Sequence, residues 1–161
     1  MDVLRILAAG IAFAVCAFEG YRRARDLKER AAFLSEISAL LERFAVGIRC
    51  FGRTSDELLE LEDGEFARLV KSFRGETGGV RAAWEKACGA LPKKREETAI
   101  LRELGRSLGA SDTESALRLL EQCGTRIRAL KSDADAEYSK RGKAIFQVGT
   151  LCGIGAAILI I

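Results

Sequence analysis

Apolar residues recur at every third or fourth position along most of the chain, which is the spacing of one face of an α-helix. The clearest stripe lies within residues 96–108 and consists of Ile100, Leu101, Leu104 and Leu108. Gly109 predicts the end of this helix, because glycine enters the left-handed cap conformation without a Cβ clash. Ser111 and Glu114 then form a capping-box pattern that starts a new helix. The sequence thus predicts two helices that reverse direction at residues 108–112.

Two longer stripes predict a long helix near each end of the chain. The first ends at about Cys50, where Gly52 stops it, and the second starts after Ser111 and meets no strong stop signal. Their apolar seams are Leu34, Ile37, Leu41, Phe44 and Ile48 in the first helix, and Leu120, Cys123, Ile127, Leu130 and Ala134 in the second. This 3-4 alternation is typical of helices that pack side by side. We therefore predict an all-α antiparallel helical bundle in which these two helices form a pair.

Shorter helices are predicted between the two long ones. Thr54 and Glu57 form a second capping box, Gly75 is expected to close the next apolar stripe, and Pro92 ends the stripe after it. These helices are expected to run to Leu61, from Phe66 to Gly75 and from Val80 to Leu91. The last of them is too short to be stable unless it buries Trp84. Trp84 is therefore predicted to be a core residue.

Apolar runs at both chain ends predict membrane helices. Residues 3–18 are apolar apart from Arg5, and extension to Tyr21 gives roughly the 20 residues that a membrane helix needs. A cleaved signal peptide is the alternative, but no small-x-small cleavage site follows the run. Residues 144–161 carry no charge. We expect an N-terminal transmembrane anchor at 1–21, a helical domain at 22–143 and a C-terminal transmembrane segment at 144–161.

Basic residues flank the middle domain at both edges next to the membrane. They are Arg22, Arg23, Arg25, Lys28 and Arg30 after the first run, and Lys140, Arg141 and Lys143 before the second. Cytoplasmic flanks of membrane helices are enriched in Lys and Arg. The sequence therefore predicts a protein of the cell membrane whose middle domain is cytoplasmic.

Gly149 and Gly153 lie four residues apart in the C-terminal run. Small residues at this spacing let helix backbones approach closely in lipid. The alternative is that glycine is simply common in membrane helices. We predict that Gly149 and Gly153 pack against the N-terminal span or against the span of a partner.

The composition argues against a catalytic or cofactor site. The chain has no histidine and 5 cysteines that are too far apart for a chelating pair, so metal binding is not expected. Cys50, Cys88 and Cys123 fit small core positions. No glycine-rich phosphate loop is present, a net charge of +3 is too weak to indicate nucleic-acid binding, and adjacent acids such as Glu96 and Glu97 do not face each other on a helix. We expect no enzyme activity, no cofactor and no nucleic-acid partner.

Six acidic residues form a cluster with no cation between Arg53 and Arg68. They are Asp56, Glu57, Glu60, Glu62, Asp63 and Glu65. One interpretation is that they stabilise helix N-termini through the helix dipole. The other is that they form a docking patch for a basic partner, and we retain this patch as a candidate partner-binding surface.

Two short motifs resemble those of the stage III sporulation protein AB family. One is Ala83–Trp84 in a short amphipathic helix, and the other is Leu104–Gly105–x–x–Leu108–Gly109–x–x–Asp112. The order of an N-terminal anchor, a helical domain and a C-terminal apolar tail also resembles this family. Trp84, Leu104, Gly105, Leu108, Gly109 and Asp112 are thereby expected to form a structural motif.

The resemblance implies a fold and a function. Members have a cytoplasmic domain similar to the helical bundle of the type II secretion system F platform protein. The chain is then expected to be a structural membrane subunit of a secretion-like channel complex between mother cell and forespore, required for endospore formation. It would act on the mother-cell side of the outer forespore membrane, as a platform for a secretion-type ATPase and beside other stage III sporulation subunits. The alternative is a two-span membrane sensor or adaptor that passes helix motion to a cytoplasmic partner.

Overall fold

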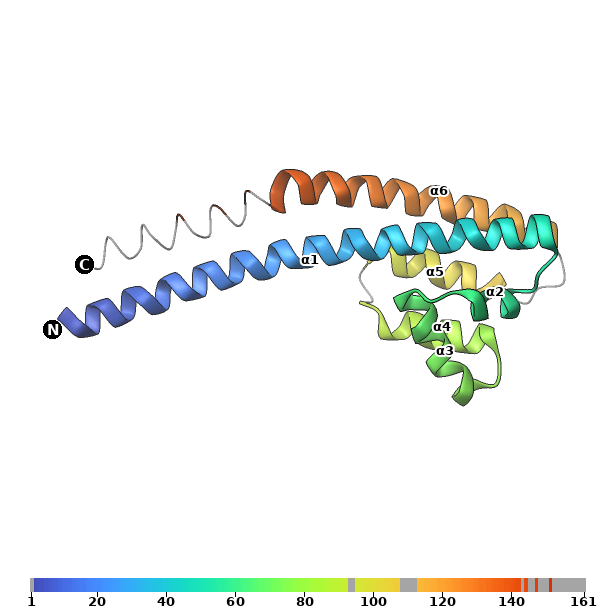
Figure 1. Ribbon diagram of the computed structural model, residues 1–161, viewed down its shortest axis with the longest axis horizontal. Coiled ribbons are helices and arrows are strands. Elements are labelled where there is room, and N and C mark those ends of the chain that lie inside the picture. The colour runs from blue at the N-terminus through green and yellow to red at the C-terminus, as the bar shows by residue number, and fades with distance from the viewer. Residues whose placement is uncertain are drawn as a thin grey trace. The chain divides into compact units, whose positions relative to one another are not determined.

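The protein is helical in a computed structural model that describes residues 2–92, 95–107 and 113–142, together with residues 144, 147 and 151 (Figure 1). The helices are α1 (Asp2–Phe51), α2 (Ser55–Leu61), α3 (Glu65–Thr77), α4 (Val80–Ala90), α5 (Glu96–Ser107) and α6 (Thr113–Glu137), followed by a π-helical turn at Tyr138–Gly142. No β-strand occurs in these described ranges. The predicted all-α class is therefore confirmed.

The chain divides into two compact units, Phe33–Lys131 and a second unit made of Met1–Ala32 and Ser132–Ile161. The first, which we call the bundle unit, contains the C-terminal part of α1, the helices α2 to α5 and the N-terminal part of α6. Within it, α3 packs against both α2 and α4, and α4 packs against α5. These short helices gather beside the C-terminal part of α1 (Figure 1).

Within the bundle unit, α1 and α6 run antiparallel. Arg49 of α1 forms an ion pair with Glu121 of α6, and Arg128 Nη1 lies 3.4 Å from Glu42 Oε1. Residue numbers thus fall along α6 as they rise along α1. The predicted pairing of the first and last helices is confirmed here, and the buried seam residues of this unit are Leu34, Ile37, Leu41, Phe44, Leu120, Cys123 and Ile127. Ala134, which belongs to the second unit, is buried as well. Ile48 and Leu130 are only partly buried.

The turn between α1 and α2 follows the predicted chemistry. Gly52 has a φ of 58°, in the left-handed region, and ends α1. Thr54 then caps α2: its Oγ1 accepts a hydrogen bond from the Glu57 N–H at 3.3 Å, and the Glu57 carboxylate accepts one from the Thr54 N–H at 3.1 Å. The predicted capping box is confirmed.

We expect Thr54→Ala to lower the free energy of unfolding by about 1 kcal/mol, because the first turn of α2 loses its side-chain acceptor. Thr54→Ser is the matched control, since it keeps the hydroxyl. The measurement is urea unfolding of the full-length protein followed by circular dichroism. Equal losses in both variants would show that the hydroxyl does not stabilise α2.

The end of α3 differs from the prediction. Gly75 does not close the helix, which continues to Thr77 and ends at Gly78 with a φ of 71°. The Gly78 N–H donates to the Arg74 carbonyl at 3.2 Å. Gly75 is exposed inside the helix, where a missing side chain is tolerated. The sequence predicts the helix end about one turn too early because two glycines, Gly75 and Gly78, lie close together.

The cysteine prediction is correct for two of the three positions that were expected in the core. Cys88 and Cys123 are buried at 0% and 1% exposure, but Cys50 is exposed. Cys50 follows the seam residue Ile48 by two positions, which on a helix is about 200° around the axis. It therefore points away from the seam, and its assignment to the core was wrong.

These burial differences predict thiol reactivity. Burial raises the pKa of the Cys88 thiol to about 11 and also raises the pKa of Cys123, so both thiols remain protonated and covered near pH 8. In a full-length Cys16→Ser, Cys152→Ser variant, we expect Ellman's reagent to label Cys50 quickly and the other two only after denaturation. Fast labelling of Cys88 in the native protein would contradict the burial of α4.

The second unit presents apolar side chains on α1. Ile11, Val15, Phe18 and Tyr21 are each more than half exposed, and their spacing of three or four residues places them on one face of the helix. Charged residues follow, with Glu19 pairing with Arg22 and Arg23. In this unit α6 ends at Glu137 and the π-helical turn follows.

Within the described residues, no helix is both long and apolar enough to span a membrane. Most of the predicted C-terminal span, including Gly149 and Gly153, lies outside those residues. The side chains at positions 2–9 of the predicted N-terminal span lie outside them too.

Candidate functional site

Trp84 of α4 lies at the centre of the bundle unit with no exposed surface. Its indole Nε1–H donates to the Leu101 carbonyl of α5 at 2.7 Å. The ring packs edge-on against Phe66 of α3 at a centroid distance of 4.9 Å and lies 6.4 Å from the ring of Phe44 of α1. One side chain therefore joins four helices, and its polar group is satisfied, as a buried indole requires.

Gly105 explains why α5 can approach this ring. A Cβ atom at position 105 would lie 2.3 Å from Trp84 Cδ1, well inside van der Waals contact. Trp84 and Gly105 thus form a packing motif between α4 and α5, and Leu104, at 1% exposure, is buried next to Gly105 in the chain. Leu108, Gly109 and Asp112, the other residues of the predicted motif, lie outside the described residues, as does Ser111 of the capping box predicted with Glu114.

The six acidic residues do not share one environment. Glu57 belongs to the capping box of α2, and Arg74 of α3 bridges Asp56, at 2.9 Å, and Glu60. Within the described residues, no ion pair involves the side chains of Asp63 or Glu65. Part of the cluster therefore stabilises the bundle, while Asp63 and Glu65 are exposed to solvent, Glu65 in the first turn of α3, where the helix dipole favours an acid.

Glu62 is the buried member of the cluster, at 6% exposure. Its two carboxylate oxygens accept hydrogen bonds from Arg43 Nε at 2.7 Å and Nη2 at 2.5 Å. The hydrogen bond to Glu62 is the main cause of the raised pKa of Arg43. A fork of this kind satisfies a carboxylate that is withdrawn from water. The sequence indicated Glu62 but not Arg43, which is 19 residues away.

A second long-range contact starts α3. Glu36 of α1 accepts a hydrogen bond from the Phe66 N–H at 3.0 Å. The N-cap residue of α3 is Gly64, which provides no side-chain hydrogen bond of its own. A Cβ at Gly64 would come within 2.4 Å of Glu36 Oε1, so glycine leaves room for the carboxylate. The acceptor that the α3 N-terminus needs is thus supplied by another helix.

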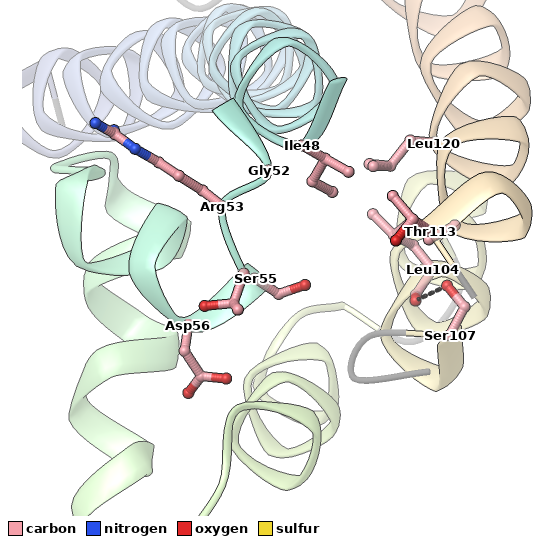
Figure 2. A pocket seen from close by; sticks show the side chains of 11 residues that line it. Ile48, Gly52, Arg53, Ser55, Asp56, Leu104, Ser107, Thr113 and Leu120 are labelled. Carbon is pink, nitrogen blue, oxygen red and sulfur yellow. Dashed lines mark hydrogen bonds between the residues drawn. The ribbon is translucent and has the colours of Figure 1, made fainter. Parts of the chain in front are cut away.

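A cavity of about 350 Å³ lies where α1 meets α2, with α5 and α6 on its other side. Ile48 and Leu120 approach each other across it (Figure 2). Two hydroxyl groups of its wall are used locally: Ser107 Oγ donates to the Leu104 carbonyl at 2.8 Å, and Thr54 Oγ1 accepts the cap hydrogen bond of α2. These hydroxyls hold helix ends.

Metal binding receives no support in the part of the chain that the structure describes. No group of three or more Cys, Asp or Glu side chains there is close enough to hold an ion.

The hydroxyl group of buried Thr98 also serves the fold, because it donates a hydrogen bond to the Pro92 carbonyl at 3.1 Å. The most specific arrangement in the bundle unit is therefore the Trp84 packing motif.

Comparisons with known proteins agree on one family. The family model described as Stage III sporulation protein AB matches residues 5–161. The protein named Stage III sporulation protein AB of Bacillus subtilis (strain 168) is 23% identical over 171 residues, covering 98% of this chain and 99% of the relative. No solved structure gives a significant match.

Proposed function

The chain belongs to the stage III sporulation protein AB family, and from this premise we propose that it is a structural membrane subunit of a sporulation complex. Specifically, the complex is a secretion-like channel between mother cell and forespore that is required for endospore formation. The observation that carries the proposal is the family match over residues 5–161. The subunit acts as a non-catalytic platform for a secretion-type ATPase.

The chemistry of the bundle unit supports a structural role. Buried polar groups there serve to join helices, as in the Arg43–Glu62 fork and the indole hydrogen bond to Leu101. Such groups rigidify a domain when they are fully satisfied. A rigid domain with charged outer faces is suited to hold other subunits in place.

Membrane attachment is part of the proposal. The N-terminal part of α1 exposes Ile11, Val15, Phe18 and Tyr21 on one face, and a helix that shows large apolar side chains to its surroundings is stabilised in lipid. We propose that residues 1–21 and 144–161 anchor the chain and that the middle domain is cytoplasmic. In this arrangement Gly149 and Gly153 pack against a neighbouring span.

Two measurements in sporulating cells of the source bacterium test the proposal. Deletion of the gene is expected to lower the count of heat-resistant spores, and the wild-type gene is expected to restore it. An affinity-tagged full-length chain is expected to co-purify from solubilised membranes with a secretion-type ATPase and further membrane subunits. Normal sporulation in the deletion strain would overturn the role. Co-purification without the ATPase would favour the sensor or adaptor alternative.

The glycine pair has its own test. Gly149→Leu with Gly153→Leu is expected to leave the helical content and the thermal unfolding of the chain unchanged but to reduce co-purification of the other subunits. Ala156→Leu with Ile160→Leu is the control, because it changes the same run at the same spacing and leaves both glycines in place. Normal assembly of the glycine variant would show that these positions only face lipid.

A further inference from the structure

An open groove between α1 and α2 leaves large apolar side chains uncovered in the bundle unit. Val46, Phe51 and Leu61 are exposed by 53%, 68% and 62%, and all three line a hollow of about 660 Å³. Gly47 and Leu58 form its base, where α2 approaches α1 so closely that a Cβ on Gly47 would lie 2.2 Å from Leu58 Cδ2. The base of the groove is therefore buried between the two helices, while the apolar side chains of its walls are exposed to solvent.

The groove has the length of a short helix. Its lining on α1 extends from Ala39 to Phe51, and at 1.5 Å per residue this stretch measures roughly 18 Å. The opposite wall runs from Leu58 to Gly64. An elongated hollow with apolar residues on both walls fits an amphipathic helix of about three turns.

The charge around the α2 wall is negative. The six clustered acids are contacted by four cations, since Arg43 and Arg74 bind carboxylates and Arg68 and Lys71 donate to the carbonyls of Asp63 and Glu60. The lining of the groove itself carries three carboxylates, of Glu42, Glu62 and Asp63, against the two guanidinium groups of Arg43 and Arg53, so its net charge is −1. Asp63, which also lines the groove, is among the carboxylates without an ion pair in the described part. A partner with a positive edge is therefore favoured on this side.

We propose that this groove binds an amphipathic helix from another protein, with its apolar face between Val46, Phe51 and Leu61 and its basic edge along the α2 wall. The inference deepens the proposed function, on which it rests, by naming the surface and the chemistry of a partner subunit. The apolar contacts provide affinity, and the acids orient the helix and speed its encounter.

Site-specific photo-crosslinking in sporulating cells tests this proposal. Benzoylphenylalanine replaces Phe51 or Leu61 in the full-length chain, and mass spectrometry identifies the crosslinked segment. Both side chains are more than half exposed, so the replacements are not expected to disturb the core. Arg118, on the exposed surface of α6, is the control position. We expect both groove positions to capture one segment of another protein, with apolar residues at helical spacing and an excess of Lys and Arg.

A charge reversal makes the test sharper. Asp63→Lys is expected to reduce the crosslinking yield by about fivefold or more, because it places a like charge opposite the basic edge. Glu114→Lys is the matched control on α6 and is expected to leave the yield unchanged. Equal effects of the two variants would overturn the assigned orientation.

Other captures would overturn the proposal. They are a second copy of this chain, a lipid adduct, or a yield no higher than that from position 118. The tagged wild-type chain separates the two levels of inference. If it co-purifies with the other subunits while the groove captures nothing, the groove is rejected and the proposed function stands.

Discussion

Trp84→Ala is expected to lower the free energy of unfolding by about 3–5 kcal/mol, the usual cost of emptying a large buried site. The ring has no exposed surface and touches aromatic rings from two other helices, so its removal leaves a cavity that the surrounding helices cannot easily fill. The measurement is chemical unfolding of the full-length protein in mild detergent. It is followed by circular dichroism, because Trp84 is the only tryptophan of the chain.

Trp84→Phe separates the ring from its hydrogen bond. Phenylalanine retains much of the apolar volume but loses the Nε1–H that donates to Leu101 at 2.7 Å. The Leu101 carbonyl is inside α5, where helix geometry pairs it with a backbone N–H four residues on, so it is not left without a donor. We expect a loss of about 1–2 kcal/mol, clearly smaller than for alanine. If Trp84→Ala unfolds like the wild type, the ring does not hold the bundle together.

Most of the features that could be predicted from sequence are local ones. Helix positions, the capping box at Thr54 and the helix end at Gly52 each depend on residues within a few positions of one another. The apolar seams also predicted the pairing of α1 with α6, because seam residues must find a partner surface. The errors at Gly75 and Cys50 arose within helices that were otherwise predicted correctly. At Gly75 the error concerns where the helix ends, and at Cys50 it concerns which face of the helix the side chain occupies.

Individual hydrogen bonds and ion pairs between distant residues could not be predicted. Glu36 caps α3 from 30 residues away, and nothing in the local sequence marks its carboxylate as an acceptor. The Arg43–Glu62 fork likewise depends on how α1 and α2 meet. The acidic cluster could be recognised as a charged segment and Glu57 as a capping residue, but which of the other carboxylates are paired and which are exposed follows from tertiary packing. For the candidate site, the sequence marked Trp84 and Gly105, and the structure supplied the contacts between them.

The sequence motif identified Gly105 as a structural residue, but only the structure shows why glycine is needed at this position. The nearest atom to a Cβ at position 105 belongs to the rigid indole of Trp84, at 2.3 Å. Trp84 is enclosed on all sides, so it has no free space into which it can shift. Gly105→Val is therefore expected to lower the free energy of unfolding by about 3 kcal/mol, the upper part of the usual range for overpacking a core.

Alanine at two glycine positions isolates the steric cause. Gly105→Ala adds a single methyl group and is expected to destabilise the protein by about 1–3 kcal/mol, although alanine favours a helix. Gly75 is also inside a helix but has no atom within 4 Å of its Cβ position, so Gly75→Ala is expected to stabilise by about 0.5–1 kcal/mol. The two identical replacements thus have opposite signs when unfolding is measured under the same conditions. A stabilising Gly105→Ala would mean that α5 does not lie against the Trp84 ring, and the packing motif would lose its explanation.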